Sequence, residues 1–387
     1  FFPSASAGWR ISEEAFMESV KETISNLKLR ASYGFTGNTE IGVYESLATL
    51  GTSNWILGNQ LVSGFFPNKI PNPDLKWERT GQFDVGLDLG LFNNRLRVTM
   101  DYYKKKTTDL LYNVAIPYTS GYDTMLKNIG SLENHGYELS IESDNLTGPF
   151  SWTTAFNISF NRNKVLELGG EEYKEMAEGD GHLKTGSVRR LIVGEPVGVF
   201  YGYRFDGIFQ NEEECKQQTS SAAPIGVGLR RYKDLNGDGK VDAVNDREIL
   251  GNANPKFFGG LTNTFAYKGF ELNVFLQYSV GNKILNYNAM ELETPTGGQN
   301  AYADMVNRWT PENPSNIYPK ATTNRNVLVS DRFIEDGSYL KLKTLSLSYS
   351  FPKVNIKHIQ GLRIYVTGQN LLTWTKYRGY DPEVSYR

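Results

Sequence analysis

Long runs in which apolar and polar residues alternate constrain this chain more than any other feature. Phe83, Val85, Leu87, Leu89 and Leu91 alternate with polar residues and glycines. A period of two is the pattern of a strand whose two faces meet different surroundings. Strands of soluble domains usually have about five or six residues, whereas a tilted strand needs about nine to eleven to cross a bilayer. The length of the runs therefore favours membrane strands over those of a soluble sandwich.

The same pattern predicts about ten strands in all. Their approximate ranges are 27–36, 43–50, 77–91, 95–106, 136–144, 151–163, 256–267, 270–281, 338–351 and 361–374. Within 338–351 the apolar residues change face after Leu342, which predicts a β-bulge. Helical patterns are few, and the best of them predicts a helix from Glu13 to Leu27 with Ser12 as its cap.

The connections between these strands alternate between short and long. Asn93-Asn94 and Lys268-Gly269 predict tight turns, and Asp144 to Pro149 and Pro352 to Gly361 are short links rich in turn residues. The intervening links, 108–134, 165–254 and 282–335, are long. The fold class that we predict is therefore all-β: a transmembrane antiparallel β-barrel with short periplasmic turns and long extracellular loops.

Composition narrows the classes that remain. The net charge is −2, so no basic excess indicates nucleic-acid binding. The sequence has no run of about 18 apolar residues, so no transmembrane helix is predicted. Aromatic residues make up 13% of the chain, which suits both the girdles of a barrel and an aromatic-rich soluble sugar binder. The single cysteine, Cys215, belongs to no CxxC pair, so neither a disulfide nor a zinc motif is predicted.

Eight ordered motifs resemble one known family. They are Phe2 to Arg10 (FPSASAGWR), Leu27 to Gly34 followed by Thr36-Gly37-Asn38, Asn72 to Glu78 (NPDLKWE), Asn128 to Gly130 with Asn134 to Glu138, Arg308 to Pro314 (RWTPENP), Phe333 to Lys343 (FIEDGSYLKLK), Gly368 to Leu371, and Gly379 to Glu383. This series resembles the C-terminal barrel half of the SusC/RagA family of TonB-linked outer-membrane proteins. The resemblance extends over nearly the whole chain.

The resemblance implies a function, a location and partners. It implies TonB-dependent import of large nutrients, oligosaccharides or oligopeptides, across the bacterial outer membrane. A SusD-type surface lipoprotein is the expected lid, and TonB of the inner-membrane energising complex is the expected energy source. No enzyme is expected, since no GxSxG, HExxH or Walker motif occurs. The alternative from another class is a soluble or surface-attached β-rich glycan-binding module, whose apolar faces would pack inward.

The resemblance also sets an expected domain organisation. Residues 1–387 are expected to be the C-terminal part of the barrel domain of a transporter with about 22 strands. The N-terminal plug, the TonB box and the final strand are expected to lie outside this chain. The start of the chain has no signal-peptide pattern, although an exported barrel needs one.

Polar residues on the predicted strands are candidates for the path of the cargo. These candidates are Asp84, Asp88, Arg97, Asp101, Glu138 and Glu142, together with the loop residue Trp309. The strand residues face a wet lumen if their apolar neighbours face lipid. The other interpretation is that they only form pairs across strands or contact the plug. Loop aromatics such as Phe200, Tyr203 and Phe209 either stack on cargo or pack within the loops.

One acidic segment resembles a calcium-binding loop. Asp234, Asn236, Asp238, Lys240 and Asp242 match the first nine positions of an EF-hand loop, in which the lysine would offer its backbone carbonyl. Asn245 stands where such loops carry a bidentate glutamate, and Asp246 follows one residue later. Two interpretations remain open: a structural Ca²⁺ ion, or a solvated acidic turn in a long loop.

Overall fold

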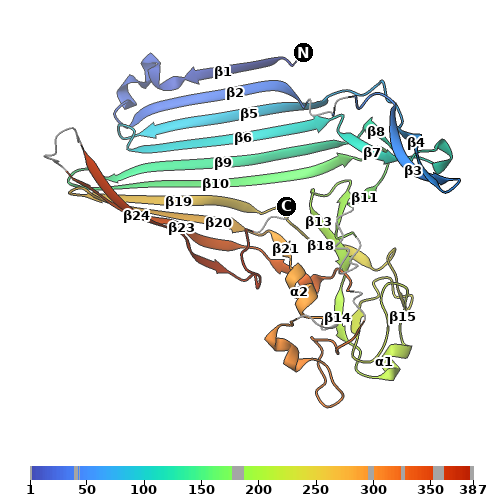
Figure 1. Cartoon of the computed structure of the whole chain (residues 1–387). Coiled ribbons are helices and arrows are strands. Elements are labelled where there is room, and N and C mark those ends of the chain that lie inside the picture. Colours follow the sequence, from blue (N-terminus) through green and yellow to red (C-terminus); the bar gives the residue numbers. More distant parts are fainter. Residues whose placement is uncertain are drawn as a thin grey trace.

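Ten strands form one antiparallel sheet in the computed structural model, which describes residues 2–38, 42, 44–176, 187–294, 300–323, 327–351 and 361–383 (Figure 1). Their order in the sheet is β1-β2-β5-β6-β9-β10-β19-β20-β23-β24. The ten strands therefore follow one another in the sheet in the same order as in the chain. The bounds are β1 Ser4–Arg10, β2 Ile24–Asn38, β5 Glu78–Leu91, β6 Leu96–Thr108, β9 Ser131–Leu146, β10 Phe150–Glu167, β19 Phe257–Tyr267, β20 Phe270–Val280, β23 Tyr339–Phe351 and β24 Leu362–Thr375.

The short connections lie at one end of this sheet and the long ones at the other. The predicted tight turns are confirmed: Asn93 and Asn94 have φ values of 57° and 59°, and Lys268 and Gly269 have 45° and 87°. Positive φ values at such turns match the right-handed twist of the flanking strands. Of the predicted link from 352 to 361, residues 352–360 lie outside the described residues. All the long connections therefore leave from the opposite end, as the barrel prediction requires.

Two local predictions at the start of the chain are wrong, and one strand there was not predicted. Instead of a helix from Glu13 to Leu27, two 3-10 turns, η1 (Ile11–Glu13) and η2 (Ala15–Val20), precede β2, because residues 24–27 pair with β5. Strand β1 has no apolar series and was not predicted. Residues 44–47 of the predicted strand 43–50 form a turn, with Tyr44 at φ 64°. That turn leads into the hairpin of β3 (Thr49–Leu57) and β4 (Gln60–Lys69).

The two faces of the ten-stranded sheet differ in chemistry. Leu29, Leu87, Met100, Leu139 and Ile158 lie in register on five neighbouring strands and share one face. That face is exposed although it is apolar: Met100 has 46% and Tyr137 has 60% of its surface accessible. The polar alternates occupy the opposite face. An exposed apolar face of this extent is expected of a wall in contact with lipid.

The predicted bulge in β23 is confirmed at Lys343. Phe275 of β20 pairs with Thr344 whereas the next residue, Leu276, pairs with Leu342, so Lys343 is the extra residue. The register between β23 and β24 shifts at the same place. The bulge lets Leu342 and Leu345 share the apolar face although their spacing is odd.

The long connections fold into a layer of their own beyond one end of the sheet, which we call the loop layer (Figure 1). Its strands are β7 Leu111–Ala115, β8 Thr124–Asn128, β11 Tyr173–Met176, β12 Arg189–Ile192, β13 Val199–Tyr203, β14 Phe205–Ile208, β15 Thr219–Ser220, β16 Arg230–Tyr232, β17 Lys240–Val241, β18 Arg247–Asn252, β21 Lys283–Leu285 and β22 Ile334–Asp336. Its helices are α1 Glu212–Lys216 and α2 Tyr287–Leu292, with 3-10 turns η3 Tyr118–Ser120, η4 Ala303–Asn307 and η5 Asp331–Phe333. No helix in the described part of the chain is long and apolar enough to cross a membrane.

The hydrophobic core lies in this layer and not on the sheet. Phe200 and Leu250 from the connection between β10 and β19 pack with Met290, Val329 and Phe333 from the connection between β20 and β23. The sequence predicts both segments only as long links, whereas the structure gives them a shared core. Phe200, Tyr203 and Phe209 are buried, so for these three the packing interpretation is confirmed. The two connections therefore stabilise each other.

Candidate functional site

Arg30 of β2 is the centre of an ionic cluster on the polar face of the sheet. Its guanidinium donates two hydrogen bonds to Asp88 of β5, at 2.9 and 3.0 Å, and one of 2.9 Å to Asp101 of β6. The register places these residues close together, since Gly86 lies between Arg30 and Asp101 on adjacent strands. A bidentate pair of this kind fixes both the orientation and the charge of the guanidinium.

Gly86 makes room for this cluster. A Cβ atom added there would lie 2.3 Å from the Asp101 Oδ1 atom and 2.6 Å from the Arg30 Nη2 atom. Only a residue without a side chain lets the arginine reach both carboxylates across the central strand. The glycine is thus part of the site although it carries no functional group.

The remaining predicted residues of the strands lie on the same polar face. Asp84 accepts hydrogen bonds from Ser32 and Gln82, at 3.1 and 2.7 Å. Glu138 of β9 lies in register with Asp101. Together with the Arg30 cluster, they place four carboxylates and one guanidinium in the middle of the face, which gives this set of residues a negative charge.

A second ion pair lies nearer the turn end of this face. Arg97 donates a hydrogen bond of 3.0 Å to Glu142 and one of 3.3 Å to Asp144. For Arg97 and Glu142 these contacts agree with the second interpretation, pairing across strands. They do not test whether cargo passes over this face.

Trp309 lies apart from this face, in the loop layer. Its indole Nε1 donates a 3.0 Å hydrogen bond to the side chain of Gln210. Its ring covers Gly228, where an added Cβ would lie 2.6 Å from the Trp309 Cε3 atom. The ring is therefore held by local packing, and a role for it in the transport path stays a prediction.

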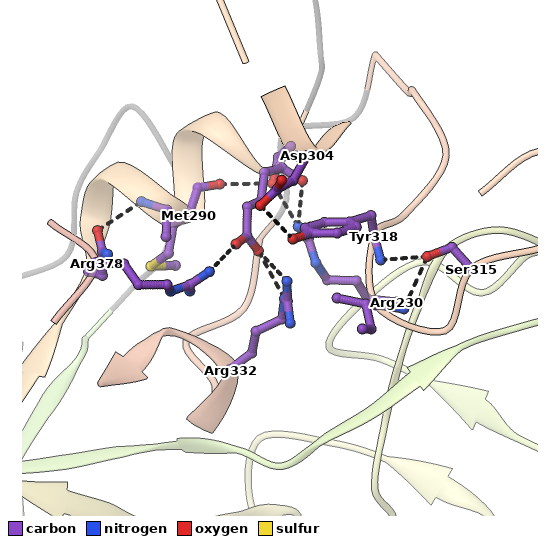
Figure 2. A network of polar contacts seen from close by, with 12 residues as sticks. Arg230, Met290, Asp304, Ser315, Tyr318, Arg332 and Arg378 are labelled. Atoms are coloured by element: carbon purple, nitrogen blue, oxygen red, sulfur yellow. Dashed lines mark hydrogen bonds and ion pairs between the residues drawn. The ribbon is translucent and has the colours of Figure 1, made fainter. Parts of the chain in front are cut away.

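A buried network of charges joins the loop layer to the segment that follows β24 (Figure 2). Glu293, which is buried, accepts hydrogen bonds from Arg332 at 2.9 Å and from Arg378 at 3.1 Å. Arg378 also donates to Glu335 at 2.8 Å. Burial lowers the pKa of Arg230, which donates to the backbone oxygen of Glu293 at 3.0 Å. Removing one partner from such a buried network is costly because a charge is left unpaired.

A third cluster fixes the segment after β24 against the sheet. The buried Lys341 ammonium contacts the carboxylates of Asp381, at 2.9 Å, and Glu383. Lys343 contacts Glu383 at 2.8 Å. Burial alone would raise the pKa of Glu383, but hydrogen bonds from the two ammonium groups outweigh it and lower that pKa to about 2. The carboxylate is therefore charged at neutral pH.

Sequence reasoning missed three of these residues for different reasons. Arg30 was detectable, because Lys28, Arg30 and Ser32 alternate with Leu27, Leu29 and Ala31. Glu293 and Lys341 carried no local signal. Glu293 contacts a residue 85 positions away, and Lys341 one 40 positions away.

The acidic segment from Asp234 to Asp246 forms a loop closed by its own backbone. Asp234 accepts hydrogen bonds from the N–H groups of Gly237 and Gly239, both at 2.7 Å. Asp246 is fully buried and accepts 2.7 Å bonds from the N–H groups of Leu235 and Asp242. Within the described residues, no group of three or more His, Cys, Asp or Glu side chains could hold a metal ion. The turn interpretation accounts for these contacts, and calcium binding stays a prediction.

The fold and the site together define a class of protein. Long antiparallel strands with an apolar outer face, a polar inner face and all long connections at one end form the wall of an outer-membrane β-barrel. The chain belongs to the family described as TonB dependent receptor-like, beta-barrel, whose sequence model matches residues 1–371.

Individual relatives agree with this assignment. The chain is 41% identical to TonB-dependent receptor P3 of Formosa agariphila over all of its length and 38% of that protein. It is 31% identical to TonB-dependent receptor SusC of Bacteroides thetaiotaomicron, covering 99% of the chain and 38% of SusC. A solved structure of the RagAB peptide importer in its open-open state matches 99% of the chain and 40% of its own, with a TM-score of 0.80 and 28% identity. The chain thus spans roughly two fifths of the length of the relatives that it matches.

Proposed function

We propose that the whole protein imports large nutrients, oligosaccharides or oligopeptides, across the outer membrane in a TonB-dependent manner. The single observation that carries this proposal is the continuous polar inner face of the sheet beneath a folded loop layer. A lumen lined in this way is wet and offers many hydrogen-bonding groups to a large polar cargo. The names of the relatives support import as the function: one is the TonB-dependent receptor SusC, and another is described as a peptide importer.

In this proposal, different parts of the polypeptide supply the barrel strands, the plug and the TonB box. Residues 1–387 would supply ten strands of a larger barrel, and the plug, the TonB box and the final strand would come from other parts of the polypeptide. A SusD-type lipoprotein would cover the loop layer and deliver the cargo. The Arg30 cluster would hold β2, β5 and β6 together while the lumen empties and fills.

The glycan-binding module is the weaker alternative. A soluble module would bury the apolar face, whereas here Met100, Tyr137 and Val366 on that face have 46%, 60% and 75% of their surface exposed. Such a face is stable in lipid and aggregates in water.

The experiment is an uptake assay in the native bacterium. Cells with and without the gene receive fluorescent oligosaccharides and oligopeptides, and uptake is measured with and without a protonophore. We expect one cargo class to enter only when the gene and the proton gradient are both present. Equal uptake by both strains, or an uptake rate that the protonophore does not change, contradicts the proposal. Co-purification of a lipoprotein with the detergent-extracted protein tests the partner separately.

A further inference from the structure

A groove lies on the apolar outer face, over the middle of β5, β6, β9 and β10. Its volume is about 350 Å³, within the range of roughly 300–1,000 Å³ typical of small-molecule sites. Aliphatic side chains form its floor, and Tyr102, Tyr137 and Phe160 from three adjacent strands line its loopward end. Tyr102 and Tyr137 stack with ring centroids 5.0 Å apart. These aromatic residues therefore border the groove on the side nearer the loop layer.

Cationic side chains follow directly beyond these aromatic residues. Two and four residues farther along β6, on the same face, are Lys104 and Lys106, and the same positions of β10 hold Arg162 and Lys164. Each step of two residues moves about 7 Å along a strand. All four side chains are exposed. We call these four residues the basic cluster.

The charge of the basic cluster is not neutralised. Glu133 of β9 is the carboxylate that faces it, and it pairs with Lys104 at 3.1 Å and lies 3.8 Å from the His135 Nδ1 atom. Arg162 donates to the backbone oxygens of Asn161 and Lys256 at 2.8 and 2.9 Å. Among the described residues, no ion pair is formed by Lys106, Arg162 or Lys164. Four cations against one carboxylate leave a clear positive excess.

The cluster is confined to one end of the outer face. At the turn end, the outward positions of the same strands hold Leu91, Leu96, Ser143 and Trp152, none of which is charged. The loop end is the extracellular end, so the basic cluster meets the headgroups of the outer leaflet. Basic patches at this level attract lipids with anionic headgroups.

We propose that this groove and the basic cluster form a binding site for a phosphate-bearing acylated lipid of the outer leaflet. An acyl chain lies in the apolar groove over β5, β6, β9 and β10. The phosphate lies against Lys106, Lys164 and the Nε and Nη2 donors of Arg162, whose Nη1 atom is held by backbone oxygens. The groove continues the lipid-facing surface, and the charge of the cluster is complementary to an anionic headgroup. The site is separate from the lumen and from cargo import.

The test measures lipid binding to the full-length protein, extracted from outer membranes and freed of lipid in a non-ionic detergent. The probes are diphosphoryl lipid A, dioleoylphosphatidylcholine and inorganic phosphate, titrated by native mass spectrometry. We expect lipid A to bind at least about tenfold more tightly than phosphatidylcholine, because three cations act on its phosphates. We expect inorganic phosphate to bind far more weakly than lipid A, because it cannot fill the groove.

Two variants make the test specific. The triple variant Lys106→Gln, Arg162→Gln, Lys164→Gln should lose the preference for lipid A over phosphatidylcholine. The control is Lys105→Gln, which is matched to the Lys106 substitution because it removes one positive charge from the same strand; Lys105 points inward, with its Nζ atom 5.1 Å from the Tyr103 ring centroid. The control should change the affinity by less than about twofold. If the triple variant does not assemble, the single variant Arg162→Gln is measured instead and should weaken lipid A binding by about threefold or more.

Three results overturn the proposal. The first is equal affinity for lipid A and phosphatidylcholine. The second is a triple variant, or the single Arg162→Gln variant in its place, that binds lipid A like the parent protein. The third is a control variant that loses as much affinity as the triple variant. Cargo uptake is measured in parallel, and its loss or retention bears on the import proposal alone.

Discussion

A charge placed on the outer face at mid-height should destabilise the barrel. Leu87 is the third of five outward residues on β5, from Phe83 to Leu91, so each end of the series lies four residues away. Four residues span about 13 Å along a strand, and a tilt of about 40° converts this length into about 10 Å of depth. Leu87 therefore lies near the middle of an apolar band about 25 Å tall. Leu87→Arg should lower the free energy of unfolding by about 2–4 kcal/mol.

Ser140→Arg is the matched control for this prediction. Ser140 lies on β9, in register with Thr99 and Asn157, and its exposed side chain is on the inner face. The new arginine would lie in the wet lumen, two residues from both Glu138 and Glu142 on the same face. We expect a change of less than about 0.5 kcal/mol, as is usual for surface substitutions.

The assay follows unfolding of the full-length protein in lipid vesicles with guanidinium, by tryptophan fluorescence and by migration in unheated gels. Both variants are compared with the parent protein in the same vesicles. Equal stability of Leu87→Arg and the parent protein would refute the assignment of the faces. So would a larger loss for Ser140→Arg than for Leu87→Arg.

Three further predictions concern the polar clusters. Gly86→Ala should lower stability by about 1–3 kcal/mol in the same assay, because the added methyl would lie 2.3 Å from the Asp101 carboxylate; an unchanged midpoint would contradict it. Since the pKa of Glu383 is lowered from 4.5 to about 2, its ion pairs stabilise the fold above pH 4.5 and are lost as the pH falls towards 2. Parent protein and Glu383→Gln should therefore differ at pH 7, by up to about 3 kcal/mol, and converge near pH 2; a pH-independent difference would speak against the pairing. Asp246→Asn should raise the rate of hydrogen exchange at residues 235 and 242, because an amide offers one oxygen acceptor fewer than the carboxylate, and leaving a backbone N–H without an acceptor costs about 1–3 kcal/mol. A Ca²⁺ titration of the parent protein tests the calcium prediction directly.

The wall of the barrel was largely predictable from sequence because its signal is local. The alternation of apolar and polar residues along β5 predicts which residues face outward. The change of phase after Leu342 predicts the bulge, which the structure places at Lys343. Strand β1 was not predictable in this way, since Ser4–Arg10 has no apolar series and owes its conformation to pairing with β2. The supposed helix from Glu13 failed because residues 24–27 pair with β5, a contact that the helical pattern does not encode.

The loop layer was beyond sequence reasoning because its contacts are non-local. The core brings together Phe200 and Phe333, which are far apart in the chain. Phe200 lies on a strand of five residues, β13, and Phe333 lies in the 3-10 turn η5 of three residues, so neither element has a periodic pattern long enough to predict. For the candidate path, alternation placed Asp84, Asp88 and Asp101 on one face. It did not reveal that Arg30 and the glycine at position 86 organise them.

The separate core of the loop layer bears on how such proteins diversify. Phe200, Met290 and Phe333 are buried among residues of the two connections, and within the described parts of the chain the strands of the wall contribute no residue to their cluster. Exchanging the two connections as a matched pair between relatives would keep this core intact and leave strand pairing in the membrane unchanged. Exchanging only one would split the core. The two connections therefore form one unit for exchange, and Arg378, which pairs with Glu293 and Glu335, has to match that unit.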